Sequence, residues 1–275
     1  MTDIAMTTAT NMAEPAAAGA AQRSLAARLS VRLLWIALSI AALIILWQGA
    51  MIAFKPPAYL IPPPAGVFNA FIDKRAALLH HGSYTFSSAL LGLTVSSVFA
   101  ISLAVLFVSF RLLAQASMPL VIGFRSMPAA AIAPLITLMV GRGVGTNIVV
   151  VVLVSFFPIL VNLMRGLQAP DRSTLELMHV YGATRWQQIR MLRAPFSLPY
   201  FFTGLRIAGA NAILGAMLAE WLTGSRGLGF LILESSELRE IELLWAAILS
   251  SVTVALLVFA ATSAAERSVL HWREA

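Results

Sequence analysis

Six stretches of this chain are apolar and about as long as a lipid bilayer is thick. They lie at roughly residues 33–54, 85–109, 116–140, 147–165, 199–222 and 243–265. A helix needs about 20 apolar residues to cross the hydrocarbon core. Only 11% of all residues are charged, against about 25% in a typical soluble domain. The sequence therefore predicts an all-α integral membrane protein with six transmembrane helices, and it excludes a soluble globular fold.

The third of these runs is the least regular. It carries Pro119, Pro128 and Pro134 inside it. A proline cannot donate its backbone hydrogen bond, and membrane helices tolerate this where neighbours satisfy the freed carbonyl. We expect a third span that is kinked or broken.

The six runs also predict how the chain is divided. The first run is too long for a signal peptide and has no cleavage site of small residues after it. We expect a disordered cytoplasmic tail (1–32), a first transmembrane helix (33–54), an outer loop with a short amphipathic helix (55–82), the core transmembrane domain (83–267) and a cytoplasmic C-terminal tail (268–275).

The loop charges predict the orientation. If the N-terminus lies inside, the inner segments hold more Lys and Arg than the outer ones, as positive-inside topology requires. Both termini are then cytoplasmic, and so is the loop between the fourth and fifth spans. The net charge of +7 is explained by this bias, so nucleic acid is not an expected partner.

Motifs for catalysis or cofactor binding are missing from the sequence. Lys55 and Lys74 are the only lysines, and neither fits a phosphate-binding G-x-x-x-x-G-K-[ST] loop. There is no H-E-x-x-H, and the lack of Cys excludes thiolate metal sites. We expect no enzyme activity, no metal and no cofactor bound by this chain.

A polar segment interrupts the apolar pattern between the fourth and fifth runs. It reads TLELMHVYGATRWQQIRMLRAP, residues 174–195. Asp171 or Ser173 can cap a first short helix, and Gly182 is expected to end it with a positive φ. A second short helix is expected to stop at Pro195. The segment is predicted to be a helix–glycine–helix hairpin in the cytoplasm.

The first helix of this hairpin carries an apolar stripe that includes Leu175, Met178 and Tyr181. Two explanations account for such a stripe outside the membrane. A groove on a partner protein can bury it, or the helix can lie on the membrane surface with Trp186 at the level of the headgroups.

The fifth run carries a seam of small residues at helical spacing. Its members are Gly204, Ala208, Ala212, Gly215 and Ala219. They fall within an arc of about 80° on a helix of 3.6 residues per turn. Small residues let helix backbones approach closely in lipid, so this seam predicts tight packing against another span.

Three ionisable residues fall in or beside the predicted spans, each near a span end. Arg125 and Arg206 either favour an anionic solute or anchor lipid headgroups. Glu220 is expected to line the outer gate or a docking surface. Arg125 and Glu220 are therefore the candidates for the gate or pathway. The glutamates between the last two spans form an acidic outer face, which is either a docking surface or simply solvated.

The polar hairpin resembles the cytoplasmic EAA loop of binding-protein-dependent ABC importer permeases. That pattern reads E-A-A, three residues, G, nine residues, I-x-L-P, and Glu176, Gly182 and Pro195 match its Glu, Gly and Pro. The departures are Leu177 and Met178 for the two alanines, Leu192 for Ile and Ala194 for Leu.

Further stretches resemble the nitrate, sulfonate and taurine subgroup, which also includes permeases for pyrimidine precursors and riboflavin. They read PAAAIAPLITLMVGRGVG, SFFPILVNLMRGL and AEWLTGSRGLGFLI, and the resemblance covers about residues 60–267.

The resemblance implies a type I permease that works as a dimer, here expected to be a homodimer in the lipid bilayer of a bacterial inner membrane. Two ATPase subunits carrying ATP-Mg would bind beneath it, and a substrate-binding protein would dock outside. The solute would be a small organic or anionic compound. The coupling residues would be Leu175, Glu176, Met178, Tyr181, Gly182, Leu192 and Pro195. A stand-alone secondary carrier is the alternative.

Overall fold

A computed structural model describes residues 31, 34–57, 59–223 and 226–270. These residues form helices and connecting turns without a β-strand. The chain divides into two compact units, residues 1–65 and residues 66–275, which are described separately. Most of the two predicted cytoplasmic tails lies outside the described residues.

The first unit contains one long helix, Leu34–Phe54. It is apolar on all sides, and none of its most apolar window is buried within the chain. A helix that is hydrophobic all round is suited to lipid rather than to an aqueous surface. Its bounds agree with the first predicted span.

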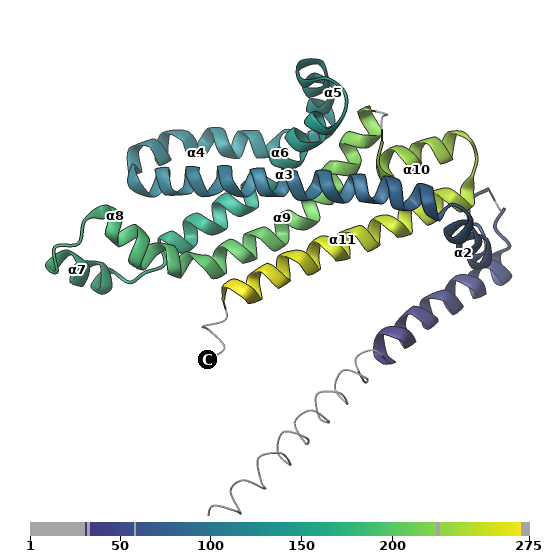
Figure 1. Ribbon diagram of the computed structural model, residues 1–275, viewed down its shortest axis with the longest axis horizontal. Helices are drawn as coiled ribbons and strands as arrows, with labels where there is room; N and C mark the ends of the chain where they lie inside the picture. The colour runs from purple at the N-terminus through teal and green to yellow at the C-terminus, as the bar shows by residue number, and fades with distance from the viewer. Residues whose placement is uncertain (1–30, 32–33, 58, 224–225, 271–275) are drawn as a thin grey trace, which may run out of the picture. The chain divides into compact units, whose positions relative to one another are not determined.

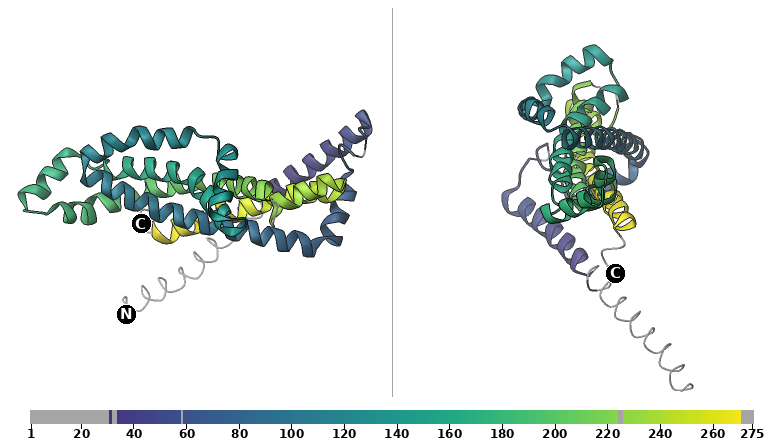
Figure 2. Two further views of the ribbon diagram at one scale, coloured as in Figure 1. Left: turned by 90° about the horizontal axis from the view of Figure 1, so that it is seen from above. Right: turned by 90° about the vertical axis from the view of Figure 1, so that its left-hand side faces the viewer.

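Four long helices make up most of the second unit and run side by side (Figures 1 and 2). They are α3 (Arg75–Ser109), α6 (Val144–Leu167), α9 (Ala194–Thr223) and α11 (Ile241–Val269). Helix α6 packs against both α3 and α9, while α11 packs against α9 and α3. Small residues allow this close packing: a Cβ on Gly92 of α3 would lie 2.5 Å from Val151 Cγ1 of α6.

The third predicted span is broken, as its prolines predict. Helix α4 (Arg111–Ser126) and helix α5 (Ala129–Val140) meet at an angle of 98°. Met127 is extended, with ψ of 129°, because the following Pro128 disfavours a helical conformation there. Helix α5 therefore stands across the direction of the long helices (Figure 1). The described residues contain five helices able to cross a membrane, or six if this bent pair counts as one span.

Two parts of the chain that were expected to be outer loops are largely helical. The short helix expected in 55–82 is α2 (Pro64–Asp73), but α3 already begins at Arg75, ten residues before the predicted start of the second span. The apolar run covers only part of α3, because a helix can continue beyond the end of an apolar stretch. The segment between the last two spans contains α10 (Leu228–Glu237), which packs back onto α9 and α11.

Candidate functional site

The polar hairpin consists of α7 (Arg172–Val180), a turn, and α8 (Arg185–Gln188). Gly182 in the turn has a φ of +71°, in the left-handed region expected for a glycine after a helix end. Asp171 is the N-cap of α7, although its side chain makes no capping hydrogen bond. Thr184 forms a complete capping box with Gln187 at the start of α8. The sequence signal that indicates this box is T-x-x-Q, at residues 184–187.

The second half of the hairpin does not end at Pro195, so that prediction is wrong. A π-helical turn, Ile189–Arg193, joins α8 directly to α9, and the three segments form one helical stretch from Arg185 to Leu222. Pro195 is the second residue of α9. The backbone nitrogen of Pro195 has no hydrogen to donate to the preceding turn of helix. The wider π-helical turn lies in that preceding stretch. The hairpin is therefore continuous with a membrane span.

Much of the apolar surface of the hairpin is exposed, but not the whole predicted stripe. Leu175 and Met178 are half-buried, whereas Tyr181 is 82% exposed. The other exposed large apolar residues of the hairpin are Leu177, Val180, Trp186 and Met191. Glu176 is exposed and pairs with Arg172 at 3.0 Å.

The base of the hairpin is fastened to the bundle. Leu192 is buried, and the Arg193 guanidinium donates a 2.9 Å hydrogen bond to the carbonyl of Leu167 at the end of α6. The hairpin is thus anchored at its base and exposed along its outer face.

The small-residue seam of α9 faces α6. A Cβ on Gly204 would lie 2.8 Å from the carbonyl oxygen of Pro158, and one on Gly215 would lie 2.6 Å from Val154 Cγ2. Ala208, Ala212 and Ala219 are fully buried. The Ser155 hydroxyl of α6 also donates to the carbonyl of Ala208 at 3.2 Å. The hairpin is therefore carried on a span that is packed closely against its neighbour.

Glu220 does not snorkel to water and is not at the surface of the chain. Its side chain is fully buried. One carboxylate oxygen, Oε2, accepts hydrogen bonds from the Thr85 hydroxyl of α3 at 2.9 Å and from the Gly229 amide of α10 at 3.0 Å. The expectation of a side chain at a docking surface is wrong in this respect, because α10 folds back over a position that looked terminal in the sequence.

The start of α10 is shaped around this carboxylate. Gly227 has a φ of +107°, and a Cβ there would collide with the Glu220 carboxyl group. The Gly227 amide donates to His81 Nδ1 at 3.1 Å, and the Leu228 amide donates to the Thr85 hydroxyl at 2.8 Å. Glu220 therefore connects α3, α9 and α10.

Arg206 is paired rather than free. Its guanidinium forms an ion pair and hydrogen bond with Glu266 of α11. No pattern in the sequence predicts a contact between these two residues, which lie 60 positions apart. The pair makes Arg206 a link between α9 and α11 and removes it from the candidates for a free anion-binding group.

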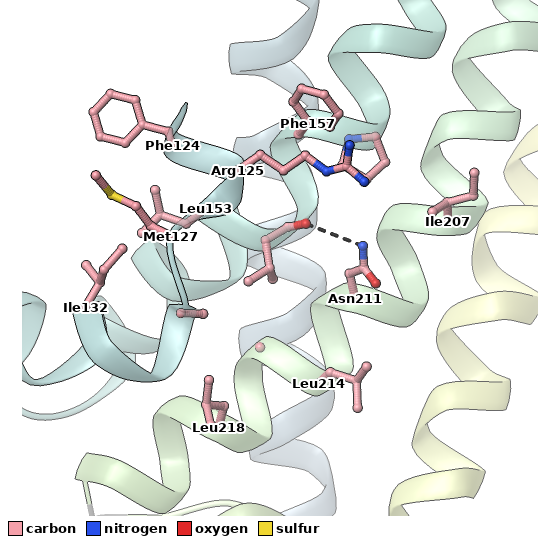
Figure 3. A pocket seen from close by; sticks show the side chains of 14 residues that line it. Phe124, Arg125, Met127, Ile132, Leu153, Phe157, Ile207, Asn211, Leu214 and Leu218 are labelled. Carbon is pink, nitrogen blue, oxygen red and sulfur yellow. Dashed lines mark hydrogen bonds between the residues drawn. The ribbon is translucent and has the colours of Figure 1, made fainter. Parts of the chain in front are cut away.

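Arg125 lies at the last turn of α4, beside the break, and faces a cavity of about 600 Å³. Its guanidinium carbon is 4.5 Å from the centroid of the Phe157 ring of α6. Figure 3 shows Arg125 reaching from α4 across to Phe157, with Asn211 of α9 facing the same space. The Asn211 amide is 3.5 Å from the Val154 carbonyl, a long hydrogen bond. The cavity is otherwise lined mainly by apolar side chains from α4, α5, α6 and α9.

Comparison with known proteins identifies the family to which this chain belongs. Residues 96–271 match the model of the family described as binding-protein-dependent transport system inner membrane component. The chain belongs to this family. It is the membrane permease subunit of an ABC importer and a multi-pass inner-membrane protein.

Individual relatives of this permease are similar over most of their length. The riboflavin transport system permease protein RibX of Chloroflexus aurantiacus is 31% identical over 84% of this chain and 87% of the relative. The formylaminopyrimidine transport permease protein ThiX of Halalkalibacterium halodurans is 33% identical over 84% of this chain and 93% of the relative. Relatives that are 24–29% identical are named for aliphatic sulfonates, taurine and nitrate.

Proposed function

We propose that the permease works as a homodimer and couples to two separate ATPase subunits through residues 172–195. The observation that carries this proposal is the hairpin, whose outer face exposes large apolar side chains while its base is fixed to the bundle. Such a surface is suited to a groove on a partner protein. The match of Glu176, Gly182 and Pro195 to the EAA pattern supports the same role.

The continuity of the hairpin with α9 supports a mechanical role. Because the chain is helical from Arg185 to Leu222, a push on α8 reaches the middle of the membrane without crossing a flexible joint. The seam of α9 then transmits the movement to α6 by close backbone contact. ATP-Mg would be bound and hydrolysed on the partner subunits, and the spans of this chain would supply the path.

The solute belongs to the class of small organic or anionic compounds. The relatives' names include flat heterocycles, riboflavin and formylaminopyrimidine, and also sulfonates, taurine and nitrate. A cavity of about 600 Å³ is large enough for any of these. A substrate-binding protein would deliver the solute on the outer side, and both termini would be cytoplasmic.

The alternative, a stand-alone secondary carrier, has less support. Coupling to an ion gradient usually uses ionisable residues along the middle of the spans. Among the described residues, Glu220 is buried in a span, but its carboxylate is held by hydrogen bonds within the chain. Membrane vesicles that contain this chain alone are expected to show no gradient-driven uptake of taurine, nitrate or riboflavin.

The hinge of the hairpin gives the sharpest test of the coupling role. Gly182→Val places a β-branched residue at φ +71°, where only strain opposes it, because an added Cβ meets no atom within 4 Å. We expect the variant to insert in normal amounts but to lose co-purification with the ATPase subunit, and uptake with it. Glu176→Lys is expected to act at the same contact.

The matched control is Gly141→Val, between α5 and α6. Gly141 also has a positive φ, +89°, with open space at its Cβ, but it precedes α6 whereas the hairpin follows it. The two glycines therefore lie beyond opposite ends of a membrane span. Normal ATPase binding and uptake by Gly182→Val would show that the hairpin is not the coupling element.

A further inference from the structure

We propose that the cavity at the α4–α5 break binds the transported solute through an oxyanion, such as a carboxylate, sulfonate or nitrate, which is held by the Arg125 guanidinium. This inference rests on the proposed permease function and narrows the class of its solute. It assigns Arg125 to solute binding, in place of the lipid-anchoring role that the sequence left open.

The depth of the guanidinium is the first support. Arg125 is 14 residues beyond the start of α4, or about 21 Å along the helix. Its contact residue Phe157 is about 20 Å from the start of α6 and about 15 Å from its end. A snorkelling side chain would extend toward the nearer surface, whereas this one reaches the middle of a spanning helix.

The second support is that Arg125 has no counter-charge among the residues that the structure describes. The ion pairs found in the described part of the chain use Lys74, Arg172 and Arg206, and none involves Arg125. The only interaction described for its guanidinium is the one with the Phe157 ring. A charged group within a membrane is costly unless it is paired, and such groups usually mark a substrate or ion pathway.

The geometry around the guanidinium suits a planar or trigonal oxyanion. An arginine has five N–H donors in a fixed fork, which matches two oxygens of one acid group. The Phe157 ring lies against the guanidinium of Arg125, which is otherwise exposed, and the guanidinium N–H groups form no hydrogen bond to the described residues. Asn211, on the facing helix α9, adds a polar amide to the same cavity.

The rest of the cavity suits the organic part of a small solute. Phe124, Leu153 and Leu214 contribute apolar surface around the polar pair. Ala129, the first residue of α5, also lines it. The N-terminal end of a helix carries a partial positive charge, so α5 adds to the potential that favours an anion there.

The experiment measures binding to the full-length purified chain in nanodiscs of phosphatidylcholine. The probes are benzenesulfonate and benzenesulfonamide, which have nearly the same shape but differ in charge, and saturation-transfer NMR reports their affinities. We expect the wild-type protein to bind the sulfonate about tenfold more tightly than the sulfonamide, the ratio that one charge-assisted interaction provides.

The variants separate the guanidinium from general charge. Arg125→Met is expected to remove the preference for the sulfonate, and Arg125→Lys to keep part of it, because lysine retains the charge but loses the fork. Asn211→Leu is expected to weaken binding less than Arg125→Met. Arg142→Met, the same change in the turn between α5 and α6, is the matched control and should bind like the wild type. Equal binding of the two probes by the wild-type protein, or an unchanged preference in Arg125→Met, would overturn the proposal.

A second arm distinguishes a solute from a lipid headgroup. In nanodiscs that also contain phosphatidylglycerol, sulfonate binding should be unchanged if the site serves a solute. Loss of the sulfonate signal there would show that a lipid phosphate occupies Arg125 and would contradict the proposal. Because neither arm needs the ATPase, failure here leaves the coupling role of the hairpin intact, and failure of the hairpin test leaves this result intact.

Discussion

Arg125 and Glu220 are both ionisable residues within membrane spans, but they differ in burial and in hydrogen bonding. Glu220 is fully buried and receives hydrogen bonds from two other helices. Arg125 faces an open cavity, and the interaction described for its guanidinium is the one with the Phe157 ring. Hydrogen bonds to Oε2 tie Glu220 into the architecture, although its Oε1 is buried without a hydrogen-bond partner. A charged group that has no such bond to the described residues is a candidate for function. The comparison predicts that removing Glu220 harms folding and that removing Arg125 harms recognition.

The largest effect is expected from Glu220→Ala. This change leaves the Gly229 amide without its buried acceptor, whereas the Thr85 hydroxyl can still donate to the His81 carbonyl at 3.2 Å. One unsatisfied buried group costs about 1–3 kcal/mol, and the loss of folding free energy should be of that size. Thermal unfolding of the purified protein, followed by helical circular dichroism, should show a clearly lower midpoint. Unchanged stability combined with lost transport would show that Glu220 acts in transport rather than in folding, and it would contradict the comparison with Arg125.

A smaller effect on stability is expected from breaking the ion pair between Arg206 and Glu266. This pair is intermediate in exposure between Glu220 and Arg125. The side chains are 44% and 22% exposed, so the pair is only partly enclosed. Interactions of this kind contribute about 1 kcal/mol or less. A double-mutant cycle with Arg206→Met and Glu266→Gln, read out as unfolding free energies, should give a coupling of that size. A coupling several times larger would mean that burial of the side chain does not decide how much an ionisable group contributes to stability.

The smallest effect on stability is expected from Arg125→Met. The guanidinium has no hydrogen bond to the described residues, and methionine can still cover Phe157 with its side chain. The change in unfolding free energy should stay within about 0.5 kcal/mol. The same thermal measurement as for Glu220→Ala gives the comparison, and a drop of similar size would show that Arg125 is structural as well.

The outline of the fold could be predicted because its causes are local. Run length sets the spans, and Pro128 breaks the third one because the residue before a proline avoids the helical conformation. Gly182 could be assigned a positive φ because a helix end commonly requires one. The end of the hairpin could not be predicted as well. Pro195 was expected to stop a helix, but within the first turn of α9 its missing N–H is tolerated.

The sequence by itself determined that this is a helical membrane protein with a polar hairpin between its fourth and fifth spans. These features follow from hydrophobicity and backbone chemistry within short windows. The tertiary structure alone decided the roles of the charges. Glu220 meets Thr85 across 135 positions of the chain, and Arg206 meets Glu266 across 60. Whether a charge inside a membrane is satisfied depends on such distant neighbours, because only packing brings a donor or a counter-charge within reach.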